Sequence, residues 1–338
     1  MATMKDIAQK LGVSCTTVSN VLHGNTKRVS PETVAKINQM IEELGYVPNM
    51  SARSLVSNSS KVIAFVNHVV IDENTNFLAD PFSSTFFGIL EKDLRENGYF
   101  LMVRTVSSSE DLISFLQNWN IDGLFIIGVF KDYFFEVLNN LNIPTVLIDS
   151  YVHDSHICNV GLEDFKGSYN ATKYLIDRGH RNIAFSSPTI KAGGVLQERF
   201  QGYKTALLDH KIPFNPDIVY VQEMDYDSCN EIALELKKRP DITAIVTTAD
   251  IMAANINASL KSLGVRVPED VSIIGFDDLV ICKLTTPPLT TVHQDMDAKG
   301  KEAVKCMLRL LKKKPLDKTE ITLSTTLVER ESVISITK

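Results

Sequence analysis

The sequence predicts a small all-α head followed by a larger α/β body of two doubly wound parallel sheets. In the first sixty residues, apolar side chains recur at the spacing of short amphipathic helices. From Lys61 onward, apolar runs of strand length alternate with longer amphipathic segments, a pattern typical of parallel sheets covered by helices on both faces. Because roughly 275 residues exceed one comfortable hydrophobic core, we expect two sheets with a cleft between them.

The head is expected to contain three short helices. The first ends at Gly12, and the second, Cys15–Leu22, follows Ser14, whose hydroxyl can cap its first turn. The third begins with Ser30 as its cap and Pro31 at the first helical position, where the missing N–H costs nothing. The apolar faces of the three helices comprise Ile7, Ala8 and Leu11, then Val18, Val21 and Leu22, then Val34, Ile37, Ile41 and Leu44.

The residues after the third helix are expected to form a joint. Pro48 blocks helix continuation, Asn49 can cap a fourth short segment over Met50–Val56, and Ser57–Ser60 is a flexible linker. A helix of about seven residues is too short to be stable by itself in water. We therefore expect Met50–Val56 to become ordered only when a partner stabilises it.

The body is expected to alternate strands and helices along its whole length. The runs that predict strands include Val62–Val66, Phe100–Val103, Gly123–Ile127, Thr145–Ile148, Ile183–Phe185, Ile218–Val221, Ala244–Val246 and Val271–Phe276. The segments that predict helices include Thr85–Asn97, Lys166–Arg178, Glu198–His210, Asp250–Leu263 and Met296–Lys313. This order favours parallel strands joined by helical crossovers.

Charge is distributed unevenly along the chain. The net charge is −6, but residues 1–61 hold seven Lys/Arg against four Asp/Glu and are therefore basic. Such asymmetry indicates a head that meets a polyanion and a body with another task. No stretch reaches the roughly 18 apolar residues of a membrane span, and residues 1–12 do not resemble a secretory signal. Five scattered cysteines suit reduced thiols, so we expect a cytoplasmic protein that does not meet a membrane.

The first two helices have the proportions of a helix-turn-helix. With its apolar face buried, the second helix exposes Cys15, Thr16, Thr17, Ser19 and Asn20. Short polar side chains can approach base edges in the major groove without steric hindrance. The alternative is that these side chains are merely solvated.

Several motifs together extend this interpretation to the whole chain. In the head and joint they are Thr3–Ala8, Gly12–Ser14, Thr17–Ser19, Val21–Leu22, Leu44–Tyr46, Pro48–Asn49 and Ala52–Leu55. In the body they are Gly179–Ala184, Glu198–Tyr203, Gly275–Asp278 and Pro287–Val292. With these motifs in this order, the chain resembles the lactose-repressor (LacI/GalR) family of bacterial transcription regulators.

The resemblance implies a DNA-binding role for the head and joint. It implies base readout by Cys15, Thr16 and Asn20, with Thr17 and Ser19 nearer the phosphates. In the joint, Leu55 resembles the leucine that two subunits insert together into the minor groove, and Ala52 and Arg53 are predicted DNA contacts beside it. Such a wedge unstacks a base step and kinks the duplex. The alternative for Leu55 is an ordinary apolar linker residue.

For the body, the resemblance implies a periplasmic-binding-protein fold with a small effector in the cleft. Arg199 and Asp277 resemble the family's two main polar ligand contacts; the alternatives are a surface ion pair and a turn residue. Phe82 and Tyr226 are expected to provide an apolar platform, or else to belong to the core. The predicted effector-binding residues are thus Arg199, Asp277, Phe82, Tyr226, Asp80 and Asp250. At the predicted cleft rim, this chain departs from many relatives at Asp80 and at Ala249, which precedes Asp250; relatives often carry Asn at both positions.

The domain limits that we expect follow from the same resemblance. The head spans residues 1–48, the hinge helix and linker 49–60, and the body 61–338. Within the body, the N-subdomain comprises about 61–161 and 293–322, and the C-subdomain about 162–292 and 323–338. The last long helix is not followed by a heptad tail, so we expect a homodimer on a near-palindromic operator.

We expect neither an enzyme nor a cofactor or metal site. His153 and His156 flank Asp154, but no further ligand stands nearby, and Gly193-Gly194 precedes no P-loop lysine. The expected function is a repressor whose operator affinity is controlled by a sugar or sugar derivative. The alternatives are a purine or nucleoside effector, a phosphorylated carrier protein, a transport-type solute-binding protein, and an enzyme on doubly wound sheets.

Overall fold

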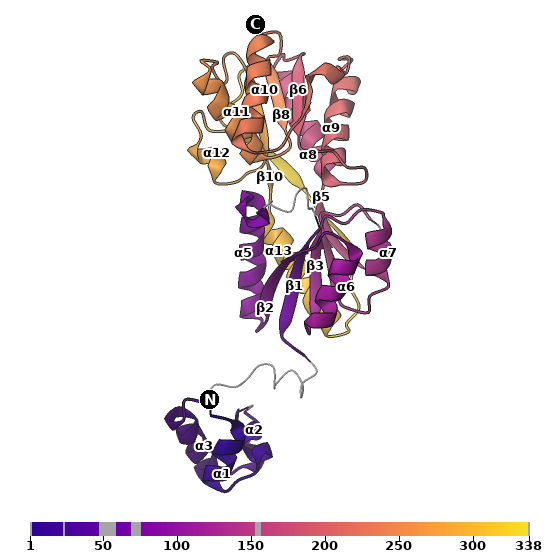
Figure 1. Cartoon of the computed structure of the whole chain (residues 1–338). Coiled ribbons are helices and arrows are strands. Elements are labelled where there is room, and N and C mark those ends of the chain that lie inside the picture. The colour runs from indigo at the N-terminus through magenta and orange to yellow at the C-terminus, as the bar shows by residue number, and fades with distance from the viewer. Residues whose placement is uncertain (1, 23, 47–58, 69–75, 153–156, 337–338) are drawn as a thin grey trace. The chain divides into compact units, whose positions relative to one another are not determined.

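The computed structural model of the chain describes residues 2–22, 24–46, 59–68, 76–152 and 157–336 (Figure 1). The chain divides into two compact units, Met1–Ser60 and Lys61–Lys338. The predicted hinge helix Met50–Val56, with Ala52, Arg53 and Leu55, lies outside the described residues, as do His153 and His156. The predicted fold class, a helical head and a doubly wound α/β body, is confirmed.

The first unit contains the three predicted helices, α1 (Met4–Leu11), α2 (Cys15–Leu22) and α3 (Pro31–Glu43), with a 3-10 turn at Thr26–Arg28. Hydroxyl caps begin α2 and α3: the amide of Thr17 donates to Ser14 Oγ (3.0 Å) and that of Thr33 to Ser30 Oγ (3.2 Å). These caps satisfy amides that the first turn of a helix leaves without partners. The helices bury one small core, formed by Ile7, Ala8, Val18, Val21 and Ile37.

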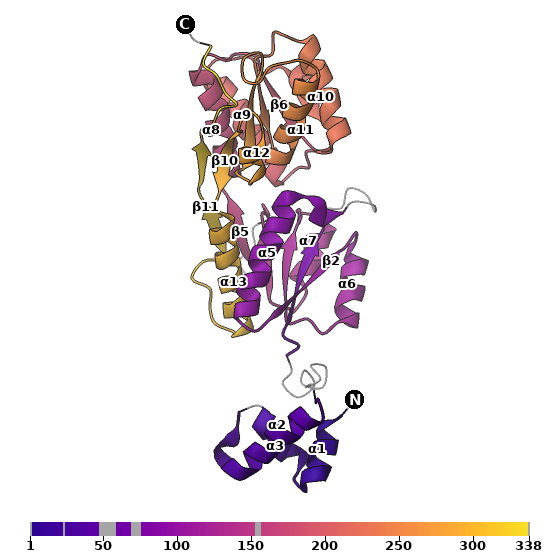
Figure 2. The same cartoon turned by 90° about the vertical axis from the view of Figure 1, so that its left-hand side faces the viewer.

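The first sheet of the body is wholly parallel, with the order β11-β5-β4-β3-β1-β2. Its strands are β1 (Val62–Asn67), β2 (Phe100–Thr105), β3 (Gly123–Ile127), β4 (Thr145–Ile148), β5 (Cys158–Leu162) and β11 (Glu320–Leu323). Two hydrophobic clusters cover its faces. Helices α5 (Pro81–Glu96) and α13 (Met296–Leu311) pack on one face, and α6 (Ser109–Asn118) and α7 (Tyr133–Asn139) on the other, as Figures 1 and 2 show.

The second sheet has the order β12-β10-β9-β8-β6-β7, parallel except for β12. Its strands are β6 (Ile183–Ser187), β7 (Val219–Val221), β8 (Ala244–Thr247), β9 (Ser272–Asp277), β10 (Thr290–Gln294) and β12 (Thr325–Val328). One face is covered by α8 (Asp164–Asp177) and α9 (Val195–Asp209), the other by α10 (Tyr226–Lys238) and α11 (Asp250–Ser262). The short helix α12 (Ile281–Leu284) follows β9, and 3-10 turns lie at Phe77–Ala79 and Pro216–Ile218.

The chain passes between the two sheets at three short connections. They join β5 to α8, β10 to α13, and β11 to β12. Ligands of parallel α/β sheets bind beyond the carboxyl ends of the strands, where connections diverge. A ligand site in a cleft is therefore expected at the residues of these three connections. In the part of the chain that the structure describes, no helix has the length and apolar character needed to cross a membrane.

Candidate DNA-binding helix and effector cleft

Helix α2 presents a small polar surface beside its buried apolar face. Cys15 and Thr16 are exposed, whereas Ser19 and Asn20 are partly exposed. Val18 and Val21 are buried against the other two helices, which fixes the rotation of α2. The helix thus displays side chains short enough to approach a major groove.

Thr17 has a structural contact of its own. Its hydroxyl lies 2.8 Å from Ser14 Oγ, while its amide donates to the same oxygen. Part of the hydrogen-bonding capacity of Thr17 therefore serves the start of α2. A role for its hydroxyl at the phosphates stays a prediction.

In the body, Arg199 on α9 is a buried cation with several partners. Nε and Nη2 each lie 2.9 Å from Asp164 Oδ1, and Nη1 donates to the Thr248 carbonyl at 2.6 Å. The guanidinium also lies 3.5 Å from the ring centroid of Phe276. Only 7% of Arg199 is exposed, so the alternative of a surface ion pair is wrong.

Asp277, the last residue of β9, faces Arg199 at a longer distance. Its Oδ1 lies 3.9 Å from Arg199 Nη1 and accepts a hydrogen bond from Gln294 Nε2 at 2.5 Å. Burial raises the pKa of Asp277 well above its usual range, although the charge of Arg199 opposes the shift. Asp277 also has φ of +116°, in a region that side chains rarely occupy. Such backbone strain is most often found at functional sites.

Asp164, the first residue of α8, joins this pair to the first sheet. Tyr151 follows β4 and donates its hydroxyl to Asp164 Oδ2 at 2.8 Å. Burial raises the pKa of Asp164, and Arg199 acts in the opposite direction. A hydrogen-bonded path therefore crosses from the first sheet to the second through Tyr151, Asp164 and Arg199.

A second path crosses between the sheets through Lys299 on α13. Its ammonium is fully buried and lies 2.7 Å from each carboxylate oxygen of Asp149 and 2.8 Å from Gln294 Oε1. Gln294 in turn donates to Asp277. The two paths together form the cleft network, which we define as Asp149, Tyr151, Asp164, Arg199, Asp277, Gln294 and Lys299.

The comparisons with known proteins agree in both units. A model of bacterial regulatory proteins of the lacI family matches residues 3–49, and a model of a periplasmic binding protein-like domain matches residues 172–333. The HTH-type transcriptional repressor PurR of Vibrio cholerae is 33% identical over 350 residues, covering all of both chains. The ribose operon repressor of Haemophilus influenzae is 31% identical over 343 residues, 99% of this chain and 100% of that one.

The chain belongs to the lacI family of bacterial regulatory proteins. It is a DNA-binding, ligand-controlled transcriptional repressor, and the matched relatives are transcriptional repressors or regulators rather than enzymes. Among solved structures, the CelR–cellobiose complex has a TM-score of 0.72 at 29% identity and covers 98% of this chain and 100% of that one. The lac repressor dimer bound to operator and the anti-inducer ONPF has the same fold, with a TM-score of 0.84 at 24% identity over 98% and 99% of the two chains.

Two of the predicted effector-binding residues in this lacI-family body lie at the start of α5. Asp80 caps the helix, accepting from the amide of Ser83 at 3.0 Å and from its hydroxyl at 2.5 Å. Phe82 is partly buried and stacks on Phe86 with ring centroids 6.1 Å apart. The ammonium of Lys299 lies 5.5 Å from the Phe82 ring, so this ring borders the cleft network.

The structure corrects the role expected for Asp250 in effector binding. This side chain is fully buried, and its Oδ2 accepts from the amide of Leu279 at 2.7 Å. Its Oδ1 accepts from the hydroxyl of Thr291 at 2.5 Å. Both oxygens are thus used to fasten α11 to β10 and to the loop after β9, which places Asp250 in the core. Burial raises its pKa to about 6.

Tyr226 is the first residue of α10, and 47% of it is exposed. The alternative that Tyr226 belongs to the core is therefore wrong. Its ring is accessible, and its contribution to an effector platform stays a prediction.

Sequence reasoning missed Lys299, Asp149 and Gln294. Lys299 stands four residues before Ala303 and eight before Met307, both buried, and so occupies the apolar stripe of α13. This position in an apolar stripe is the sequence signal that could have identified Lys299. A lysine there is buried, and lysine is almost never fully buried without a partner.

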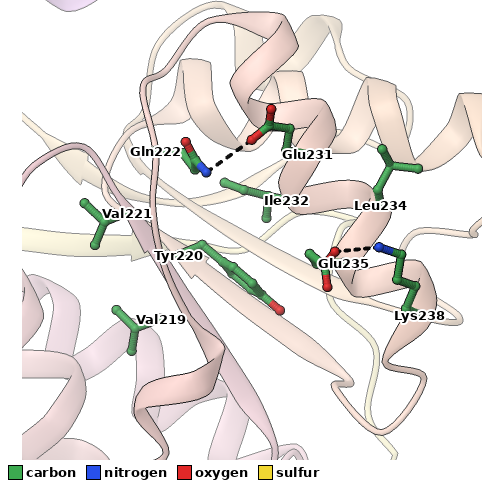
Figure 3. Close-up of a pocket in the computed structure, with 9 residues that line it drawn as sticks. All are labelled: Val219, Tyr220, Val221, Gln222, Glu231, Ile232, Leu234, Glu235 and Lys238. Atoms are coloured by element: carbon green, nitrogen blue, oxygen red, sulfur yellow. Dashed lines mark hydrogen bonds and ion pairs between the residues drawn. The ribbon is translucent and has the colours of Figure 1, made fainter.

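The described part of the body contains, among its pockets, two that lie on different elements of the fold. The larger, of about 720 Å³, is lined by His68, Ser107, Phe130, Lys131, Asp132, Tyr151, Lys191, Ala192 and Gly193. The smaller, of about 390 Å³, lies between edge strand β7 and α10 (Figure 3). Its charged groups pair internally, with Lys238 at 2.7 Å from Glu235, and it contains no member of the cleft network. The larger pocket contains Tyr151 and so adjoins the network.

Proposed function

We propose that the chain acts as a homodimer that binds a near-palindromic operator. A carbohydrate-type effector raises or lowers its affinity for that operator. The distance from Arg199 to Asp277 is the observation that supports the effector site. At 3.9 Å it exceeds hydrogen-bond length, so a hydroxyl beside the pair can bridge it, accepting from Nη1 and donating to Oδ1. A ring with several hydroxyl groups offers such donor–acceptor pairs, and a fixed guanidinium opposite a carboxylate suits them.

The names of matched proteins support a carbohydrate. One solved neighbour is described as a CelR–cellobiose complex, and one relative is a ribose operon repressor. We assign Arg199 and Asp277 as the main polar contacts of the effector. Phe82, Asp80 and Tyr226 are proposed rim residues around them.

For the DNA interface, we propose that Cys15, Thr16 and Asn20 contact base edges. Thr17 and Ser19 would lie nearer the phosphates. The exposure of Cys15 and Thr16 on α2 supports this assignment. We propose Ala52, Arg53 and Leu55 as contacts of the hinge segment, on the resemblance of that segment to the family.

The cleft network supports a coupling between effector and operator. It joins the ends of β4, β9 and β10 to the starts of α8 and α13, so it spans two of the three crossings between the sheets. An effector that enters the network replaces some of these contacts and favours one arrangement of the sheets over another. Because coupling is reciprocal, operator binding changes effector affinity by the same factor. Two hinge segments in a dimer would transmit this change to the heads.

We propose residues 1–48 as the head, 49–60 as hinge and linker, and 61–338 as the effector and dimerisation body. The body's subdomain limits are proposed near 161, 292 and 322, where the chain crosses between sheets. Because its target is DNA in a bacterial cell, we propose that the protein acts in the cytoplasm.

The experiment that tests the effector assignment is a thermal-shift screen of the full chain against sugars, purines and nucleosides. A ligand at a hundred times its Kd stabilises by about 2.7 kcal/mol, enough to move Tm by several degrees. A carbohydrate that raises Tm and changes operator affinity supports the proposal. A purine or nucleoside that raises Tm and changes operator affinity would be the effector in place of a carbohydrate. If no compound raises Tm, a protein partner such as a phosphorylated carrier is favoured.

A further inference from the structure

The larger pocket, which adjoins the cleft network, is lined by basic side chains from loops of both sheets. Lys131 lies in the loop after β3 of the first sheet, and Lys191 in the loop after β6 of the second. His68, directly after β1, adds a third basic side chain. Among the described lining residues, Asp132 is the single carboxylate.

Neither lysine ammonium has a carboxylate partner within the part of the chain that the structure describes. In this they differ from the five surface lysines that form ion pairs there: Lys36, Lys166, Lys173, Lys238 and Lys305. Asp132 caps α7 by accepting from the amide of Phe135 at 3.3 Å, and its single negative charge is outnumbered by the two lysines. An anion in this pocket therefore meets cations that are not yet neutralised.

Aromatic side chains give the pocket fixed walls. Phe130 lies in the loop after β3 and packs on Gly194, the N-cap of α9. The contact is so close that a Cβ added to Gly194 would lie 2.6 Å from the ring of Phe130. The ammonium of Lys191 lies 5.4 Å from the centroid of the same ring. His68 stacks on Phe134 with ring centroids 3.7 Å apart, and its Nδ1 bonds the Val106 carbonyl at 3.2 Å. These contacts hold Lys191 and His68 beside one cavity.

Tyr151 connects the pocket to the proposed effector contacts. It lines the pocket, and its hydroxyl donates to Asp164, which is paired with Arg199. The pocket and the Arg199–Asp277 pair differ in charge, because the network around that pair holds three carboxylates against two cations. The network thus suits hydroxyl groups, whereas the pocket suits an acidic group.

We propose that the effector carries an acidic group, a phosphate or a carboxylate, which binds in this pocket between Lys131 and Lys191. This inference rests on the proposed carbohydrate site, and it specifies the chemical class of the effector as a phosphorylated sugar or a sugar acid. The volume of about 720 Å³ is within the range of small-ligand pockets. Because the two lysines come from loops of different sheets, an anion bound between them attracts both ammonium groups and links the two loops.

The test compares matched neutral and acidic sugars on the full chain by isothermal titration at 150 mM salt, a concentration chosen to screen weak surface pairing. The pairs are glucose with glucose 6-phosphate, ribose with ribose 5-phosphate, and galactose with galacturonate. Each is measured with the wild type and with the Lys131→Gln/Lys191→Gln variant. Lys301→Gln/Lys318→Gln is the matched control, since it removes the same charge from exposed positions of the body.

We expect the acidic member of at least one pair to bind about tenfold or more tightly than its neutral partner. The pocket variant should lose that advantage while the control keeps it. If neutral sugars bind and their acidic partners bind no more tightly, the inference is wrong and the proposed function stands. Acid binding that survives in the pocket variant also overturns the inference.

Inorganic phosphate separates the two proposals when no sugar binds. If none of these sugars binds, they are excluded as the proposed carbohydrate effector, and phosphate alone then decides the pocket. Saturable phosphate binding that the pocket variant loses and the control retains supports the anion site. Phosphate binding that is absent, or equal in all three proteins, overturns it.

Discussion

Replacing Lys299 by methionine tests whether the cleft network stabilises the body. Methionine fills the space of the lysine stem but cannot donate to Asp149 or Gln294. The wild-type ammonium makes contacts of 2.7, 2.7 and 2.8 Å and has no exposed surface. The variant therefore leaves the Asp149 carboxylate largely buried without a partner.

The expected cost follows from this burial. Removing one partner of a buried ion pair costs about 3–5 kcal/mol, because the remaining charge keeps its desolvation penalty. In a chain of this size, such a loss lowers Tm by on the order of 10 °C. Adding Asp149→Asn removes the unpaired charge, so the double variant should be more stable than Lys299→Met alone. Asparagine also tolerates the left-handed backbone of Asp149, whose φ is +51°.

Urea denaturation and thermal melts of the full chain provide the measurement. Lys301→Met is the matched control, since it makes the same change two residues later at an exposed position of α13. The control should change the free energy of unfolding by less than about 0.5 kcal/mol. A cost of less than about 1 kcal/mol for Lys299→Met, or a further loss of stability when Asp149→Asn is added, would contradict a buried ion pair that stabilises the body.

Three further predictions concern other parts of the chain. Burial raises the pKa of Asp250 from 3.8 to about 6, so the folded state binds this proton more tightly than the unfolded state does. The stability of wild type relative to Asp250→Asn should therefore fall as pH rises from about 4 to above 6 in urea titrations, and a constant difference would contradict the assignment. Gly202→Ala places a Cβ against the backbone of Phe165 and should cost about 1–3 kcal/mol, whereas Gly88→Ala on α5, with open space around it, should be neutral or slightly stabilising in the same melts. Leu55→Ala should weaken operator binding about tenfold or more in fluorescence anisotropy and leave effector affinity unchanged, and an unaltered operator affinity would remove the wedge from the hypothesis.

Local signals in the sequence were sufficient for the head. Ser14 and Ser30 act on amides three residues away, so the caps of α2 and α3 depend on little beyond their own turns. The apolar faces of the helices likewise follow from spacing alone, and Ile37 is fully buried as its stripe predicts. Propensity and tertiary packing agree here.

Strands with polar residues could not be recognised in the same way. Strand β10 holds Thr290, Thr291 and Gln294, all buried, yet it shows no continuous apolar run. Its polar atoms find partners far along the chain: the amide of Thr290 donates to Ser332 Oγ, and the hydroxyl of Thr291 to Asp250. Burial of such residues is favourable only because these distant partners exist.

The cleft network illustrates the same limit at the site. Family motifs pointed to Arg199 and Asp277, and the structure brings these two side chains within 3.9 Å. Lys299 and Asp149 are 150 positions apart and belong to no motif that the sequence displays. Only the packing of α13 against the first sheet brings this pair together, whereas a helical lysine by itself predicts an exposed side chain. Asp250 shows the opposite case. The sequence predicts that it contacts the effector, whereas the structure buries it in the core, where it accepts hydrogen bonds from Leu279 and Thr291.

We propose above all that a ligand bound at Arg199 and Asp277 controls operator affinity. The operator Kd tests this most directly, measured on a duplex selected in vitro, with and without a carbohydrate identified in the thermal screen. The carbohydrate is expected to change the wild-type Kd about tenfold or more. Asp277→Asn should bind the operator as the wild type does without carbohydrate and show no change when it is added. A variant that still responds at wild-type carbohydrate concentrations would contradict the claim.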